Sequence, residues 1–292
     1  MRVGVIGLGN IGGHVAANLV TVGHEVVVFD VDSARAGSIK GASAAATVAD
    51  VGAASEVTVL SLPTPTVVRQ VADEWVTTAA PGSVLVDLST NSPEVVRELG
   101  TRLLDSGHHL VEAPLTGGAP GAENRMLSFM VGGDDDAVAR VQPVLEPLGR
   151  AFVHLGPLGL GNTMKLVNSL IAFTTTWVSL EGLSLAAKSG IPVQQAVEVL
   201  RTNGVANFYL DRMVESIDAR DRPTQFALGL AAKDAGLIVE TGRALGVPTP
   251  AGGAVLQVLV GAIAAGLGDR DWSDLVTAAE RQGDVELHWA TD

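Results

Sequence analysis

The chain of 292 residues contains no cysteine. It therefore forms no disulfide bond, offers no thiolate ligand to zinc and has no cysteine nucleophile, which fits a reducing compartment. Basic residues are also scarce, since 19 of them face 32 acidic residues and leave a formal net charge of −13. Nucleic acids and anionic membranes need a basic surface, so these partners are disfavoured, whereas a small anionic ligand held by a local cation is not.

Charged residues make up 17% of the chain and hydrophobic residues 47%, which excludes a disordered protein. The N-terminal segment Met1–Gly7 becomes glycine-rich too early for a signal peptide, so we expect a cytoplasmic protein. The segment Ala244–Gly268 carries no charge and is long enough to span a bilayer. Because it contains Pro248, Pro250 and six glycines, we predict a loop followed by a buried helix instead.

The sequence pattern changes near residue 155. Before it, short apolar runs predict strands at Val3–Ile6, Glu25–Asp30, Val57–Leu60, Val84–Asp87, His109–Glu112, Ser128–Val131 and Phe152–His154. Helical patterns separate several of them, at Ile11–Val20, Thr66–Trp75 and Pro93–Leu104. After it, helices are predicted at Met164–Ser189, Val193–Thr202, Phe208–Ser216, Phe226–Leu245, Gly253–Ala265 and Trp272–Gln282. We therefore predict an α/β domain with a doubly wound (Rossmann) parallel sheet in residues 1–160, and an all-helical domain in residues 161–292.

A glycine fingerprint follows the first predicted strand. Gly7-Leu8-Gly9-Asn10-Ile11-Gly12 matches G-x-G-x-x-G and opens a helix, and Asp30 ends the next strand 18 residues after Gly12. This context predicts a dinucleotide site, with Gly7, Gly9, Asn10, Ile11 and Gly12 against the pyrophosphate and Asp30 on the ribose hydroxyls. A carboxylate there repels a 2′-phosphate and favours NAD, although the nearby Arg35 keeps NADP open. The alternative is an ordinary glycine turn.

Two further segments follow predicted strands on the cofactor side. Leu62-Pro63-Thr64-Pro65 fits a cofactor loop, but equally a strand exit with proline at a helix start. In Asp87–Pro93, Ser92 and Pro93 fit the N-cap and first position of a helix. Thr90 then lies at the carboxyl end of its strand, where open α/β sheets bind ligands.

Thr116, Gly117 and Gly118 place a hydroxyl before two glycines. Consecutive backbone N–H groups exposed by glycine form a cradle for a small carboxylate, so we predict substrate binding here. A flexible loop is the alternative.

Lys165 is the only formal charge between Ala151 and Leu180. On a helix, it shares one face with Asn168, Ser169 and Ala172, which offers a cation, an amide and a hydroxyl beside small residues. Burial favours the neutral amine and so suits acid/base catalysis. The alternative is a lysine that reaches solvent through its long side chain.

Lys233 and Asp234 interrupt another apolar helix. Adjacent residues on a helix point in different directions, so no mutual ion pair is expected, and a solvated polar edge is the alternative to a functional site.

In this order, the motifs resemble those of β-hydroxyacid dehydrogenases, especially the 3-hydroxyisobutyrate dehydrogenase and tartronate semialdehyde reductase group. The match runs through the glycine fingerprint, Asp87–Thr90, Ala113–Gly118, Gly161–Asn168 and Lys233-Asp234. The resemblance implies a dinucleotide domain joined by a long helix to a helical domain. It also implies reversible hydride transfer between a small β-hydroxy acid and NAD. The residue roles that it implies are acid/base catalysis by Lys165, substrate binding by Thr116, Gly117, Gly118 and Asn168, and cofactor contacts by Thr90 and Lys233. From their positions in the sequence alone, Leu62 and Pro63 are also expected at the cofactor, and Ser169 at the substrate.

Three positions depart from the pattern of that group: Thr116 replaces a serine, Ser169 an asparagine and Arg125 a glycine. These departures bear on the substrate.

Imine reductases share the fold but usually replace the lysine, so an imine or other carbonyl reductase and a non-catalytic dinucleotide-binding module are the alternatives. The six histidines lack metal-ligand spacing, and we expect no metal. The uncharged Gly253–Gly268 helix suits a subunit interface, so a homodimer or homotetramer is expected.

Overall fold

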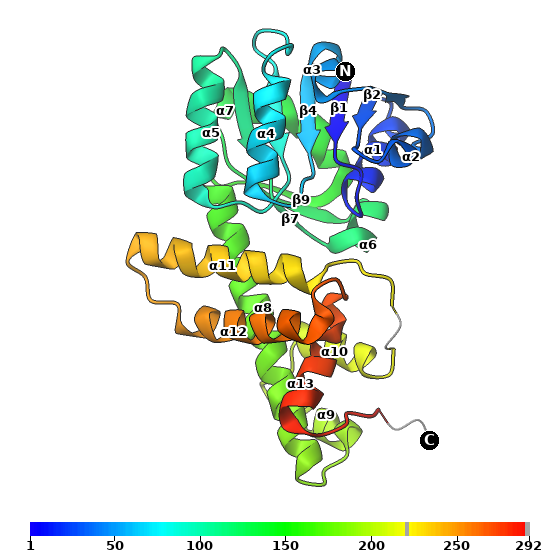
Figure 1. Cartoon of the computed structure of the whole chain (residues 1–292), viewed down its shortest axis with the longest axis vertical. Helices are drawn as coiled ribbons and strands as arrows, with labels where there is room; N and C mark the ends of the chain where they lie inside the picture. The colour runs from blue at the N-terminus through cyan, green and yellow to red at the C-terminus, as the bar shows by residue number, and fades with distance from the viewer. Residues whose placement is uncertain (220–221, 290–292) are drawn as a thin grey trace. The chain divides into compact units, whose positions relative to one another are not determined.

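The computed structural model describes residues 1–219 and 222–289 (Figure 1). Internal contacts divide the chain into two compact units, Met1–Lys165 and Leu166–Asp292. The division falls within helix α8 (Leu160–Lys188), a few residues after the boundary expected from the sequence.

The first unit contains a six-stranded sheet in which every neighbouring pair is parallel. Its strands lie in the order β3-β2-β1-β4-β5-β6, as in a doubly wound fold, so the predicted fold class is confirmed. Their bounds are Arg2–Ile6 for β1, Glu25–Phe29 for β2, Ser43–Ala44 for β3, Val57–Leu60 for β4, Val84–Asp87 for β5 and His109–Glu112 for β6. The central strands β4 and β5 are buried at every position, which explains their continuous apolar sequence.

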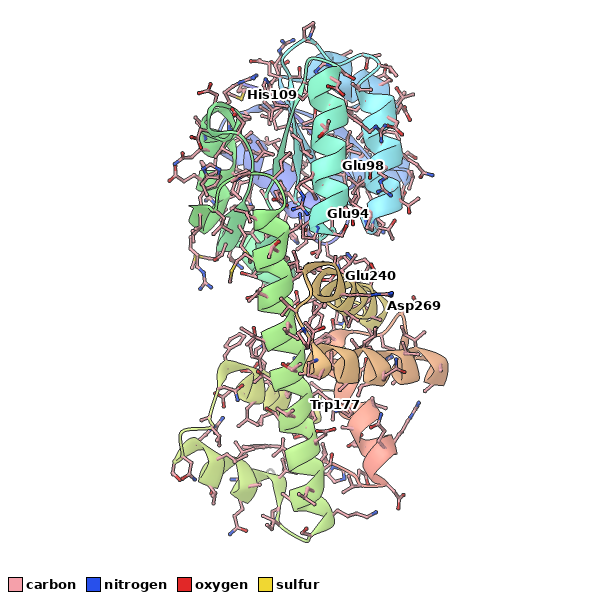
Figure 2. The ribbon with its side chains drawn as sticks, turned by 90° about the vertical axis from the view of Figure 1, so that its left-hand side faces the viewer. Glu94, Glu98, His109, Trp177, Glu240 and Asp269 are labelled. Carbon is pink, nitrogen blue, oxygen red and sulfur yellow. The ribbon has the colours of Figure 1, made fainter. Side chains whose placement is uncertain are left out.

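Helices cover both faces of this sheet. The apolar face that includes Val3 and Val5 packs against α1 (Gly12–Thr21) and α7 (Asp135–Leu145). The opposite face, with Ile6 and Leu60, packs against α3 (Val48–Ala54), α4 (Pro65–Trp75) and α5 (Pro93–Asp105). Helices α4 and α5 lie side by side, and Arg69 of α4 pairs with Glu98 of α5 at 2.8 Å (Figure 2). The short helix α2 (Ser33–Ser38) follows β2.

A second, three-stranded sheet completes the first unit. Its strands are β7 (Leu115–Thr116), β8 (Leu127–Val131) and β9 (Gly149–His154), with α6 (Gly118–Glu123) between the first two. Strand β8 is antiparallel to β7 and parallel to β9. The prediction that placed the last two strands in the doubly wound sheet is therefore wrong. A local apolar pattern predicts a strand but does not determine which strand it pairs with.

The second unit is built from helices, as predicted. After α8 come α9 (Val193–Arg201), α10 (Phe208–Ile217), α11 (Leu228–Leu245), α12 (Pro250–Ala262) and α13 (Leu275–Gly283). A π-helical turn, Ile263–Leu267, continues α12, and the 3₁₀ turn Trp272–Asp274 precedes α13. Their core includes Leu180, Leu183, Val197, Ile217 and Leu259, none of which is exposed.

Two helical stretches, α8 and Pro250–Leu267, are long and apolar enough to cross a membrane by length and composition alone. The sequence predicted a buried helix in the second of them. In the structure, α12 buries only the face that carries Gly252, Val255, Leu259 and Ala262, while Val260 on another face is 47% exposed. Within this chain burial is therefore limited to that one face, and burial of the remaining surface in a subunit interface stays a prediction.

Candidate dinucleotide and active site

The three fingerprint glycines meet different surroundings. Gly7 has φ +88°, and a Cβ there would collide with the carbonyl oxygen of Ser61. A Cβ on Gly12 would collide with the carbonyl oxygen of Gly7, whereas one on Gly9 would meet nothing within 4 Å. The fold itself thus requires glycine at the outer two positions. The space over Gly9, beside the N-terminus of α1, fits the approach of a pyrophosphate to backbone N–H groups.

Asp30 lies directly after β2, as expected. Its Oδ2 accepts a hydrogen bond from the backbone N–H of Leu8 at 2.6 Å, and its Oδ1 accepts one from Asp32 at 2.8 Å. A carboxylate has about four lone-pair sites, so about two remain for further donors. Arg35, the residue that keeps NADP open, pairs with the carboxylate of Asp32 at 3.5 Å.

The loops after β4 and β5 are linked at the carboxyl edge of the sheet. The backbone N–H of Leu62 donates to Ser89 Oγ at 3.0 Å. Pro63 is exposed and Thr90 is half-buried in these loops. Thr64 is the N-cap of α4, which begins at Pro65. In the segment Leu62–Pro65, the last two residues therefore start a helix, as one of the two interpretations predicted.

The expected capping of α5 is also confirmed. Ser92 Oγ accepts a hydrogen bond from the N–H of Val95 at 3.1 Å, and α5 begins at Pro93. This role removes Ser92 from the candidate ligand-binding residues and leaves Thr90 at the strand end.

The predicted carboxylate cradle is a turn between β7 and α6. Thr116 ends β7, and the next two residues, Gly117 and Gly118, both have left-handed backbones with φ +119° and +61°. Successive backbone N–H groups in turns with left-handed residues form anion-binding nests, so this backbone is compatible with the predicted carboxylate site. Arg125 has a left-handed backbone as well, with φ 56°.

Lys165 lies on α8 and is half-buried. The helix begins at Leu160 rather than at the predicted Met164, because its first turn finds a distant acceptor. The buried carboxylate of Glu112 accepts hydrogen bonds from the backbone N–H groups of Gly159 and Gly161, at 2.5 and 3.0 Å. Glu112 is 47 residues or more from these donors in the sequence, so local pattern gives no sign of it.

Asn168 and Ser169 follow Lys165 on the same helix at i+3 and i+4, the spacing of one helix face. Asn168 is half-buried and Ser169 is buried. Both belong to the helical unit by internal contacts.

A buried polar network that the sequence did not indicate joins the ends of β5 and β6 to the first turn of α8. Asp87 and Glu112 are register partners at the ends of β5 and β6. Asp87 Oδ2 accepts from the amide of Asn91, whose backbone N–H donates to Asn162 Oδ1 at 2.7 Å. The amide of Asn162 in turn donates to Glu112 Oε2 at 2.5 Å. The available signal was two carboxylates at the ends of adjacent predicted parallel strands.

Burial changes the acidity of both carboxyl groups. It raises the pKa of Asp87 to about 6, a shift that hydrogen bonds from Ser89 and Asn91 oppose and the nearby charge of Glu112 increases. Burial likewise raises the pKa of Glu112, against the effect of its hydrogen bonds from Asn162, Gly159 and Gly161. The two strand ends therefore exchange protons closer to neutrality than ordinary carboxyl groups do.

Lys233 lies in α11 of the helical unit. Its Nζ is 2.8 Å from Oδ1 of Asp234, a buried carboxylate. The expectation that these adjacent residues do not pair is wrong, and Asp234 is not part of a solvated edge. The long lysine side chain can turn back along the helix surface, which a comparison of Cβ directions overlooks.

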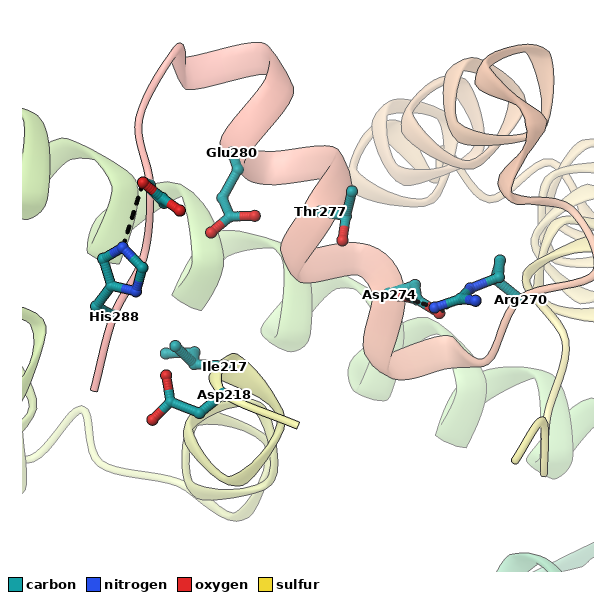
Figure 3. A pocket seen from close by; sticks show the side chains of 8 residues that line it. Ile217, Asp218, Arg270, Asp274, Thr277, Glu280 and His288 are labelled. Atoms are coloured by element: carbon teal, nitrogen blue, oxygen red, sulfur yellow. Dashed lines mark hydrogen bonds and ion pairs between the residues drawn. The ribbon is translucent and has the colours of Figure 1, made fainter. Parts of the chain in front are cut away.

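A pocket of about 460 Å³ in the helical unit lies among Ile217, Asp218, Arg270, Asp274, Thr277, Glu280, Glu286 and His288 (Figure 3). None of the predicted site residues lines it. Asp274 pairs with Arg270 at 3.0 Å, and Glu286 pairs with His288 at 3.3 Å. Across residues 1–219 and 222–289, no group of three or more potential side-chain ligands is placed to hold a metal ion.

Comparison with known proteins matches both parts of the chain. Residues 2–156 match the family model for the NAD-binding domain of 6-phosphogluconate dehydrogenase. Residues 159–279 match the model described as NAD-binding of NADP-dependent 3-hydroxyisobutyrate dehydrogenase.

Individual relatives cover nearly the whole chain. It is 31% identical to 2-(hydroxymethyl)glutarate dehydrogenase of Eubacterium barkeri, over 98% of this chain and 97% of that one. It is also 31% identical to an NAD-dependent L-serine dehydrogenase of Pseudomonas aeruginosa, over 93% and 95% of the two chains. The structure of 3-hydroxyisobutyrate dehydrogenase from Mycobacterium tuberculosis with L-serine superposes with a TM-score of 0.87 at 28% identity, covering 94% and 98%.

Proposed function

The chain belongs to the β-hydroxyacid dehydrogenase family, and we propose that Lys165 is the general acid/base of its reaction. The protein is an oxidoreductase that transfers a hydride between the CH–OH group of a hydroxy acid and a nicotinamide dinucleotide. NAD is the cofactor that the family supports, and NADP is also compatible.

The observation that carries the proposal is the position of Lys165. It is half-buried on α8, within thirty residues that contain no other formal charge. A lysine amine shifts readily between its charged and neutral forms when it is partly removed from water, which suits proton transfer. A proton must leave the hydroxyl group as the hydride leaves its carbon, and an amine so placed can take it.

Separate groups of residues are proposed to bind the cofactor, bind the substrate and transfer the proton. When bound, NAD would supply the nicotinamide ring as hydride acceptor. Gly7–Gly12 and Asp30 hold the dinucleotide, while Thr116, Gly117 and Gly118 hold the substrate carboxylate through a hydroxyl and backbone N–H groups. Neutral Lys165 removes the hydroxyl proton during oxidation, and the protonated amine returns it to the carbonyl oxygen during reduction. Asn168 and Ser169, on the following turn of α8, are the further candidates for substrate binding, and Leu62, Pro63, Thr90 and Lys233 are the further candidates for cofactor binding.

The names of the relatives define a substrate class. 2-(Hydroxymethyl)glutarate, L-serine and 3-hydroxyisobutyrate all contain the unit HOCH₂–CHX–COO⁻, in which a primary alcohol is β to a carboxylate. We infer that the substrate of this protein has the same unit, with X set by side chains such as Thr116 and Ser169.

The substrate class is tested by assaying these three acids and their methyl esters with NAD. Cyclic imines are assayed with NADPH in parallel. We expect turnover of at least one acid and little with its ester, which lacks the anionic carboxylate. Equal rates with ester and acid would refute the carboxylate cradle, and turnover restricted to imines would refute the reaction class.

Lys165→Ala tests the acid/base role. We expect kcat to fall by about 10²–10⁴, the usual contribution of a general acid/base, while the Kd of NADH changes little. Lys188→Ala is the matched control, because Lys188 ends the same helix, is exposed, and pairs with Asp284 at 3.0 Å. Near-normal kcat in a folded, NADH-binding Lys165→Ala enzyme would refute the role.

We also propose that the protein is a homo-oligomer. Met164, Ile171, Val178 and Leu185 recur every seven residues on α8 and are 41, 57, 58 and 71% exposed. A seven-residue apolar repeat is the pattern by which one helix packs on another, so a second copy of this chain is the occupant that it favours. Light scattering should give a dimer or tetramer, and Ile171→Glu with Val178→Glu should lower the mass. A wild-type monomer at micromolar concentration would contradict the proposal.

A further inference from the structure

The first turn of α8 is fastened to the sheet by one buried carboxylate. Glu112 is not exposed to solvent and accepts four hydrogen bonds. Its Oε1 accepts from the N–H groups of Gly159 and Gly161, and its Oε2 accepts from the backbone N–H and the side-chain amide of Asn162, at 3.0 and 2.5 Å. The first N–H groups of a helix have no acceptor within the helix, so this carboxylate supplies what the helix start lacks.

The carboxylate itself has little freedom to move. Its backbone exchanges two hydrogen bonds with Gly132, each at 2.9 Å. A Cβ on Gly132 would collide with Glu112 Oε1, and a Cβ on Gly161 would lie 3.1 Å from Glu112 Cδ and 2.5 Å from the carbonyl oxygen of Met130. Glycine on both sides thus lets strand, carboxylate and helix approach closely.

Asn162 adds a second attachment. It is fully buried, and its Oδ1 accepts from the backbone N–H of Asn91 at 2.7 Å. The amide of Asn91 donates to Asp87 Oδ2, and Asp87 Oδ1 accepts from the N–H of Ser89 at 2.9 Å. The ends of β5 and β6 therefore hold the same helical turn from two directions.

Lys165 comes three residues after Asn162, which is nearly one turn of helix. Its backbone position and Cβ direction follow from the turn that Glu112 and Asn162 hold. We propose that Glu112 and Asn162 are positioning residues that set the place and direction of the Lys165 amine for proton transfer. This inference rests on the proposed acid/base role of Lys165. Its physical basis is that a displacement of about 1 Å in a reacting group can reduce the rate on the order of 10²-fold.

The central test first removes the carboxylate from Glu112 and then places a carboxylate at the position of Asn162. In Glu112→Gln, one N–H group of the new amide faces the N–H donors of Asn162, so donor opposes donor. We expect kcat to fall by roughly 10- to 100-fold, with an unchanged Kd for NADH and faster hydrogen exchange at the amides of Gly161 and Asn162. Adding Asn162→Asp restores an acceptor opposite the new amide and should recover about tenfold of the loss. Glu94→Gln, at an exposed first-turn glutamate of α5 (Figure 2), should leave kcat unchanged.

A milder variant covers the case in which Glu112→Gln does not fold. Asn162→Ala removes only the side-chain attachment and leaves three backbone donors on Glu112. We expect it to fold, to bind NADH normally and to lose about tenfold in kcat. Wild-type kcat in Asn162→Ala, together with wild-type kcat in Glu112→Gln wherever that variant folds, would overturn the inference.

The Lys165→Ala background separates positioning from general loss of structure. Once the amine is absent, its position is irrelevant, so Asn162→Ala should lower kcat little further. An equal fold-loss in both backgrounds would overturn the inference and indicate a structural role only. If Lys165→Ala alone retains normal kcat, the proposed function fails first. If Lys165→Ala loses kcat while the Glu112 and Asn162 variants do not, only the positioning inference fails. All assays use the fastest of the three acids with NAD.

Discussion

Asp30 Oδ2 accepts a hydrogen bond from the backbone N–H of Leu8 at 2.6 Å. The residue predicted to select the cofactor thus also holds the glycine loop that is predicted to receive the pyrophosphate. A charge-assisted bond from carboxylate to backbone N–H is among the stronger hydrogen bonds in proteins. The predicted cofactor specificity and the order of the glycine loop therefore depend on the same side chain, that of Asp30.

Asp30→Ser should reduce the preference for NAD over NADP, because it removes the charge that repels a 2′-phosphate. It should also weaken NAD itself, since the shorter side chain does not reach Leu8. The ratio of kcat/KM for the two cofactors measures the first effect, and the Kd of NADH measures the second. Asp32→Ser is the control, because Asp32 is exposed and pairs with Arg35. A wild-type enzyme that used NADP as well as NAD would contradict the assignment.

Alanine at the fingerprint glycines should separate binding from folding. Gly9→Ala meets no protein atom within 4 Å, so stability should be retained while a methyl group enters the predicted pyrophosphate space and weakens NADH binding by roughly 10-fold or more. Gly12→Ala would collide with the Gly7 carbonyl and should lower stability by about 1–3 kcal/mol. Urea unfolding and NADH titration of both variants measure these effects. Normal NADH affinity in Gly9→Ala would place the pyrophosphate elsewhere.

Asp87 should make stability depend on pH in an unusual direction. Because burial raises its pKa from 3.8 to about 6, between about pH 4 and 6 the folded protein retains a proton that the unfolded chain has already lost. Its contribution to stability is fully present below pH 4 and decreases as pH rises to 6, by roughly 3 kcal/mol.

Asp87→Asn should remove that decrease, so the stability of the variant relative to wild type should improve from pH 4 to pH 7. The Oδ1 atom of Asn91, which is buried without a partner in the structure, would accept from the new amide after rotation of the Asn91 side chain. Urea unfolding at pH 4, 5, 6 and 7 gives the comparison, with Asp105→Asn at an exposed carboxylate as control. A stability difference that stays constant over this range would exclude the raised pKa.

Arg125 is exposed and has a left-handed backbone, with φ 56°. A side chain in that region costs about 1–2 kcal/mol, and glycine loses part of this advantage through its greater freedom in the unfolded chain. Arg125→Gly should therefore raise the free energy of unfolding by about 0.5–1 kcal/mol. The neighbouring Glu123→Gly, within α6, should lower it. Destabilisation by Arg125→Gly would show that the arginine side chain makes a compensating contact.

The sequence by itself determined the features that depend on neighbouring residues. Apolar runs indicated five of the six strands of the parallel sheet but not the two-residue strand β3, and the spacing from Gly7 to Asp30 indicated the dinucleotide fold. Ser92 and Pro93 marked the start of α5, because a cap and a first-turn proline act within a few residues. Lys165 stood out because its surroundings along the chain contain no other charge.

Only the tertiary structure decided the features that join distant residues. Glu112 and Asn162 meet across 50 positions, and Asn91 and Asn162 across 71, so neither pair forms a local pattern. These bonds extend α8 to Leu160, ahead of the start predicted from its apolar periodicity. The pairing of β8 with β9 in a second sheet likewise joins residues that are not neighbours in the sequence. The chemistry of each side chain was readable in the sequence, but buried donors and acceptors choose their partners only once the strands have brought them together.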